Sequence, residues 1–114
     1  MDDEAIDEEA RSRGVYSVHL YRDVRASYPD SIIANTVWKQ SVWFKEVVEE
    51  MQAGTWKEYF AANRNGFDMD MKSGAVDVVW GSIVPAGSVE VLEGLKTDIK
   101  EGRITIPYNL DDWP

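Results

Sequence analysis

The order of the predicted helices and strands along the chain indicates an α/β fold. Helical stretches are recognised by apolar residues that recur at steps of three to five positions, and strands by short apolar runs rich in β-branched residues. The two kinds largely alternate over 114 residues, in the order helix, strand, strand, helix, strand, helix, strand. Such alternation is typical of a sheet covered by helices, which binds its ligands beyond the carboxyl ends of the strands.

The first half of the chain predicts one helix and two strands. Residues 2–13 place acidic side chains in a first helical turn, where they favour the helix dipole, and Gly14 ends this helix. Residues 15–20, with the sequence VYSVHL, alternate as a strand does. The polar loop RDVRASYPDS, residues 22–31, leads into the predicted strand 31–38, which is apolar on both faces over much of its length. That pattern favours a buried, parallel strand.

The second half predicts two further helices and two short strands. The helical period begins at residue 41, and a glycine at position 54 closes the helix. Residues 55–73 are polar and irregular, so we expect a loop there. Residues 75–80, AVDVVW, form the third predicted strand, and residues 88–101 carry an apolar helical face. The sequence RITIPY, residues 103–108, predicts a short terminal strand.

Composition excludes several classes of function. The chain has 21 acidic and 12 basic residues and a net charge of -9, which argues against nucleic acids and anionic membranes as partners. It has no cysteine, so disulfides and thiolate metal sites are excluded, and His19 is its single histidine. The acidic start is not a signal peptide, because it lacks a basic region followed by an apolar one.

Enzymatic chemistry finds little support in the residues. His19 lies on a predicted strand without a recognisable serine or cysteine nucleophile, so we expect it to be packed or hydrogen-bonded. The sequence DMD at 68–70 has too few oxygen ligands for a metal cage and is better explained as a solvated turn. We therefore predict no catalytic residues, no metal and no cofactor. Trp43 and Trp56 flank a predicted helix and are interpreted as packing residues.

Five segments, with their order and spacing, carry a family pattern. The most specific motifs in them are AGTW at 53–56, KSGAVDV at 72–78, and a VP pair that precedes the last helix. The segments are EEARSRGVYSVHLYRDV, SIIANTVWKQSVWF, EVVEEMQAGTWK, MKSGAVDVV and VPAGSVEVLEGLKTDIKEGRITIPY. Over residues 8–108 this set resembles the carboxyl-terminal third of the BMP family. These are basic-membrane-protein-like substrate-binding proteins of ABC transporters, including the purine-nucleoside-binding lipoproteins.

The resemblance implies a fold, a function and a location. Family members are bilobed type I periplasmic-binding-protein folds, with a three-layer, mostly parallel sheet in each lobe and the ligand between the lobes. Residues 1–114 are then expected to be the carboxyl-terminal part of such a domain, truncated at the N-terminus, with pieces of both lobes. The implied function is binding of a small, nucleoside-like solute for an ABC permease, by a membrane-anchored protein outside the cytoplasm. A fragment of this kind is expected to self-associate through unpaired strand edges.

The resemblance also implies candidate ligand-binding residues in the two regions that follow the first strands. Asp23 falls on a family aspartate that contacts sugar hydroxyls in nucleoside binders. Tyr21 falls on an earlier family aspartate and departs from the pattern.

In the second region, an ungapped alignment places Trp38 on a family lysine that faces the ligand. A one-residue shift places Lys39 there instead and matches NTVWKQ, which begins at Asn35. We include all three residues as candidates and prefer the ungapped register. Trp38 then offers a flat surface for a base, although it could equally fill the core between the lobes. The alternative function is a free-standing α/β interaction domain, or a truncated gene product, that binds no ligand.

Overall fold

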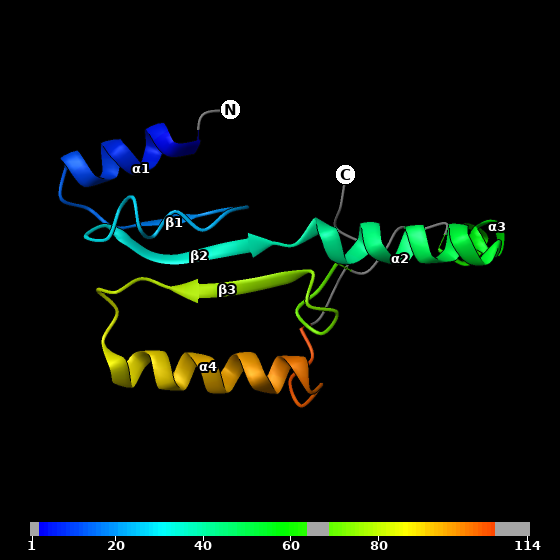
Figure 1. Ribbon diagram of the computed structural model, residues 1–114. Helices are drawn as coiled ribbons and strands as arrows, with labels where there is room; N and C mark the ends of the chain where they lie inside the picture. Colours follow the sequence, from blue (N-terminus) through cyan, green and yellow to red (C-terminus); the bar gives the residue numbers. More distant parts are fainter. Residues whose placement is uncertain (1–2, 64–68, 107–114) are drawn as a thin grey trace, which may run out of the picture.

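The computed structural model describes residues 3–63 and 69–106. Within these ranges the chain is a small α/β domain with a mixed three-stranded sheet and four helices (Figure 1). The α/β class predicted from the sequence is therefore confirmed. In chain order the elements are α1 (Asp3–Ser12), β1 (Ser17–His19), β2 (Ile32–Trp38), α2 (Gln40–Ala53), α3 (Trp56–Ala62), β3 (Val76–Trp80) and α4 (Ala86–Lys100).

The sheet is mixed, so the prediction of a mostly parallel sheet is only partly correct. Strand β2 lies in the middle, parallel to β1 and antiparallel to β3. The reason is the course of α2, which continues outward beyond the end of β2 instead of crossing back over the sheet (Figure 1). The chain therefore re-enters the sheet at the end where it left, and Trp38 pairs with Val76.

Two other sequence predictions need correction. The segment expected to be an irregular loop contains α3, a helix of seven residues whose short length gave no clear apolar period. The predicted terminal strand does not form in its described part, residues 103–106. There the backbone N–H groups of Arg103 and Ile104 both donate to the carbonyl of Asp98, which folds the chain back onto the end of α4. Residues 107 and 108 lie outside the described residues.

The core lies under the loop between β1 and β2, and it is small. Val24 and Tyr28 of that loop pack with Ile32 at the start of β2. Helices α2, α3 and α4 contain no buried residue over their described lengths. The radius of gyration is 17.7 Å, whereas a compact chain of this length has about 13 Å. The chain is thus much more open than an ordinary domain of its size.

No helix among the described residues has both the length and the apolar character needed to span a bilayer.

Candidate functional site

Two aromatic side chains meet where the parallel strands β1 and β2 end. Trp38 is the last residue of β2, and its backbone N–H donates to the carbonyl of Tyr21, just after β1, at 3.0 Å. The rings form a T-shaped pair with centroids 4.9 Å apart and an interplanar angle of 75°. Tyr21 is 51% exposed and Trp38 is 44% exposed. The structure therefore places Trp38 on the surface, where the parallel strands β1 and β2 have their carboxyl ends.

The backbone of Tyr21 is strained. Its φ angle is 75°, and it is the one residue other than glycine with a positive φ in the described chain. A bulky residue in this region costs about 1–3 kcal/mol, and such outliers cluster at functional sites. Tyr21 was noted in the sequence only as a departure from the family pattern. Its contact with Trp38 depends on a backbone conformation that no sequence pattern predicts.

Lys39 follows Trp38 and contacts a different group. Its Nζ lies 3.9 Å from Oδ2 of Asp77 on β3, and its side chain is 50% exposed. Lys96 and Lys100 of α4 approach Oδ1 of the same carboxylate, at 3.3 and 3.7 Å. Burial raises the pKa of Asp77, but the hydrogen bond from Lys96 and the neighbouring lysine charges outweigh it, so the pKa lies below its usual range. Lys39 thus shares an anionic partner with two other cations.

The carboxylate of Asp23 is held by Arg25. The guanidinium donates from Nε to Oδ1 at 2.8 Å and from Nη2 to Oδ2 at 2.7 Å, a two-pronged arrangement. These side-chain hydrogen bonds are the main reason that the pKa of Asp23 lies below its ordinary value. Both oxygens of Asp23 are therefore engaged, and ligand hydroxyls would have to share them with Arg25.

Asn35 is fully buried and fastens the loop that carries Tyr21 and Asp23. Its Oδ1 accepts a hydrogen bond from the backbone N–H of Val24 at 2.9 Å. Its Nδ2 donates to the carbonyl of Arg22 and, at 3.4 Å, to that of His19. The predicted ligand contact of Asn35 stays untested, and the observed bonds give it a positioning role. It is the residue that ties the carboxyl end of β1 to the middle of β2.

Substituting Asn35 with alanine should destabilise this loop. The change leaves the N–H of Val24 and the carbonyl of Arg22 without their partner, at about 1–3 kcal/mol for each group that remains buried. We expect a loss of about 3 kcal/mol in urea unfolding, with early hydrogen exchange in residues 20–24. Asn63→Ala is the control, because Nδ2 of Asn63 donates to the carbonyl of Tyr59 at the end of its own helix, α3, at 2.8 Å. Equal stabilities of the two variants would contradict the positioning role.

His19 belongs to a buried cluster beside α1. Its Nδ1 lies 2.5 Å from Oδ2 of Asp7, and the hydroxyl of Ser17 donates to Oδ1 of the same carboxylate at 2.8 Å. The expectation that His19 is hydrogen-bonded is therefore confirmed. In a nucleophilic relay the imidazole stands between the serine and the aspartate. Here the carboxylate stands in the middle, so Ser17 is not activated by His19.

The acidic pair suggested by DMD is only partly described. Asp68 lies outside the described residues, whereas Asp70 accepts a hydrogen bond from the backbone N–H of Ser73 at 2.7 Å. That bond is the main reason that the pKa of Asp70 is lowered. Asp70 therefore stabilises a turn before β3, as the sequence predicts. Across residues 3–63 and 69–106 no group of three acidic or histidine side chains is arranged to hold a metal.

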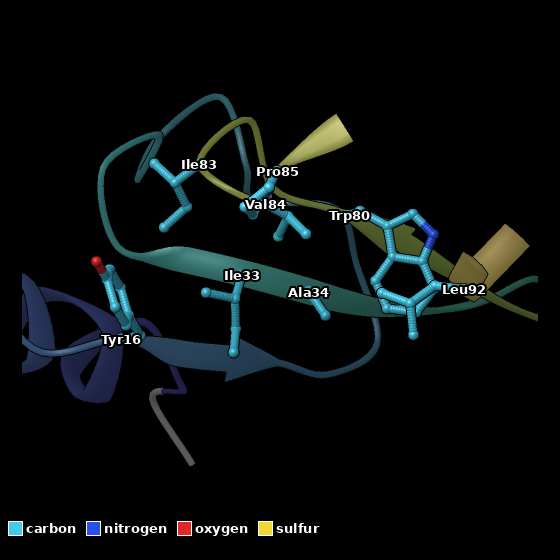
Figure 2. Close-up of a pocket in the computed structure, with 8 residues that line it drawn as sticks. All are labelled: Tyr16, Ile33, Ala34, Trp80, Ile83, Val84, Pro85 and Leu92. Carbon is cyan, nitrogen blue, oxygen red and sulfur yellow. The ribbon is translucent and has the colours of Figure 1, made fainter. Parts of the chain in front are cut away.

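A cavity in the described part of the chain lies away from the aromatic pair. It has a volume of about 430 Å³ and opens between the sheet and the start of α4 (Figure 2). Trp80 and Leu92 bound it on one side and Tyr16 on the other. Its lining is mainly apolar and includes none of the four predicted ligand residues. It offers space for an apolar group but few polar atoms to orient one.

Comparison with known proteins gives no match: no family model fits the chain, and no curated protein or solved structure is similar to it. These comparisons neither support nor contradict the family suggested by the sequence motifs.

Proposed function

We propose that the chain is the carboxyl-terminal part of a BMP-like substrate-binding protein with a type I periplasmic-binding-protein fold. In this proposal Tyr21 and Trp38 form one wall of a site for a flat, nucleoside-like solute. The observation that carries the proposal is the strained, half-exposed aromatic pair at the carboxyl ends of β1 and β2. A core role alone would not require a surface position or a left-handed backbone at tyrosine.

The geometry of the pair suits contact with a planar group. In a T-shaped pair the edge of one ring points at the face of the other ring. The ring that uses its edge makes no contact with its partner through either of its two faces. A purine base can stack on such a face. Asp23 follows β1, two residues after Tyr21, and supplies a carboxylate at this end of the sheet. A carboxylate is suited to accept hydrogen bonds from the hydroxyl groups of a sugar.

The proposed role is binding without chemistry. The intact protein would enclose the solute between two lobes outside the cytoplasm and deliver it to an ABC permease. One wall alone buries only part of a ligand, so this chain by itself should bind nucleosides with millimolar dissociation constants. High affinity would require the opposite lobe.

Nucleoside titration followed by nuclear magnetic resonance tests the proposal. The five tryptophans give five indole N–H signals, and the signal lost in Trp38→Phe identifies Trp38. Inosine or adenosine should shift the Trp38 signal saturably, with a dissociation constant in the millimolar range, while glucose should not. Trp38→Ala should weaken binding on the order of tenfold, and Trp38→Phe much less, because most of the stacking area survives.

Lys39→Ala is the internal comparison. Its side chain lies on the face of β2 opposite to Trp38, so its removal should leave the nucleoside shifts nearly unchanged if the ungapped register is correct. Loss of binding in Lys39→Ala with retention in Trp38→Ala would favour the shifted register. Shifts absent at every concentration, or spread evenly over all indoles, would refute the aromatic site.

The alternative function, an interaction domain, is favoured by a different observation. Large apolar side chains are exposed on several elements, and helices α2 to α4 bury none of their described residues. A surface of this kind normally has a partner.

A further inference from the structure

A pocket lies between α2, α3 and the turn that precedes β3. Its volume is about 250 Å³, which equals the volume of about eight molecules of liquid water and suits a small ligand. Trp43 and Glu46 of α2, Tyr59 of α3 and Ser73 of the turn are among the residues that line it. It shares no residue with the proposed nucleoside wall.

The fold brings three separate segments to this pocket. Gly54, whose φ angle is 76°, ends α2 in a conformation that glycine adopts without strain. Helix α3 then folds back beside α2, so that the hydroxyl group of Tyr59 donates to the carboxylate of Glu46. The turn before β3 reaches the start of α2, where the backbone N–H of Lys39 donates to the carbonyl of Ala75 at 2.7 Å (Figure 1). The pocket therefore depends on the folded chain and not on one helix.

The polar side chains of the pocket favour a cation over an anion. Nδ2 of Asn63 is a donor that is already bonded to the carbonyl of Tyr59, at 2.8 Å. The hydroxyl group of Ser73 donates to the carbonyl of Asp70 at 3.0 Å, and its backbone N–H donates to Oδ1 of the same residue at 2.7 Å. No lysine or arginine is among the described residues that line the pocket. An anion would therefore meet no positive charge in this lining, and donors that are already in use.

The negative charge of the lining belongs to Glu46. Burial, followed by the hydrogen bond to Glu46 and the charges of Glu46 and Glu50, raises the pKa of Tyr59 to about 12. The phenol therefore stays protonated at neutral pH, and a strongly shifted pKa in a cavity is typical of a functional site. A carboxylate has about four lone-pair sites, so Glu46 can accept from the phenol and still face a cation. The net charge of -9 also concentrates cations around the chain.

Aromatic and sulfur-containing side chains complete the lining. The faces of tryptophan and tyrosine rings attract cations, most effectively where water is excluded. Trp43 and Tyr59 supply such rings, and Met69 adds a polarizable thioether. We propose that this pocket binds a small organic cation with a methylated ammonium group, whose charge faces Glu46 and whose methyl groups contact the aromatic rings. Such a group matches a lining that is part polar and part apolar.

Choline and its neutral counterpart, the alcohol in which carbon replaces the nitrogen, test the proposal on the wild-type chain. The two probes have the same shape and differ in charge. At constant ionic strength, choline should shift the indole N–H signal of Trp43 saturably, with a millimolar dissociation constant. The signal lost in Trp43→Phe identifies Trp43. The neutral alcohol should bind at least about tenfold more weakly, because it lacks the attraction to Glu46 and to the rings.

Two substitutions on α2 locate the charge that the cation recognises. Glu46→Gln removes the charge and keeps the size of the side chain, so it should weaken choline binding at least about tenfold. The matched control is Glu49→Gln, since Glu49 is an exposed acid of the same helix whose carboxylate lies 3.7 Å from Nζ of Lys45. It makes the same change in net charge and should alter binding less than about twofold, because salt screens exposed charges. Equal binding of the two probes, equal effects of the two variants, or no saturable shift with choline would each overturn the proposal.

Discussion

Replacing Asp7 with alanine should detach α1 from the sheet and lower the free energy of unfolding by about 3–5 kcal/mol. Asp7 and His19 are 2% and 4% exposed and lie 2.5 Å apart. Removing the carboxylate leaves the imidazole of His19 and the hydroxyl of Ser17 buried without their common partner. The loss of one member of a buried pair costs more than the pair contributes, because the other member remains desolvated.

Helix α1 has little else to hold it. Ile6, its largest apolar residue, is 63% exposed, and Ala10 is its one buried apolar side chain. The ion pair between Glu4 and Arg22 is solvent-exposed, and such pairs contribute little. The position of α1 on β1 therefore depends on a polar anchor, which differs from the usual apolar helix face.

Urea unfolding and hydrogen exchange of residues 3–12 measure the effect. Glu8→Ala is the matched control, because Glu8 is an exposed acidic residue of the same helix, and it should change stability by less than about 0.5 kcal/mol. In the double variant Asp7→Ala with His19→Ala, the second substitution should cost much less than it does alone. Additive losses, or an Asp7→Ala variant as stable as Glu8→Ala, would contradict the anchor.

The elements of the fold could largely be predicted from the sequence, whereas their directions could not. The apolar run at 31–38 and the glycine at 54 located β2 and the end of α2 closely, since composition and a left-handed glycine are local signals. The antiparallel entry of β3 depends on where α2 lies after it leaves the sheet. That is a tertiary property, and a buried strand has the same apolar pattern beside a parallel or an antiparallel neighbour.

The candidate site shows the same division. Trp38 was expected at the carboxyl end of a strand, and the structure places it there. The partnership with Tyr21 could not be foreseen, because it arises from one left-handed backbone angle. Arg25 binds the carboxylate of Asp23 and is only two residues away from it in the sequence. Which partner a surface carboxylate binds nevertheless depends on the turn that brings the two side chains together. Local sequence patterns thus located candidate residues such as Trp38, whereas the contacts of these residues depend on the fold.

The close approach of Gly81, just after β3, to the backbone of β2 should make Gly81→Ala one of the most damaging substitutions in the chain. A Cβ at this position would overlap the carbonyl oxygen of Ile32 and lie 2.8 Å from its carbonyl carbon. Backbone atoms cannot rotate away as a flexible side chain can. Relief would require separating β2 from β3, which breaks the 2.9 Å hydrogen bond from Gly81 to Ile33. We expect a loss of about 3 kcal/mol or more, or an insoluble product.

Gly94→Ala in α4 is the matched control. Nothing lies within 4 Å of a Cβ built at Gly94. A glycine inside a helix is less stable than alanine by about 0.5–1 kcal/mol, so this variant should be stabilised by that amount. The same methyl group is therefore expected to act in opposite directions at two glycines, which thermal unfolding of the two variants measures directly. If Gly81→Ala also unfolds at or above the wild-type temperature, β3 does not approach β2 this closely in solution. The register that sets Asp77 beside Lys39 would then be wrong too, because both follow from the same strand pairing.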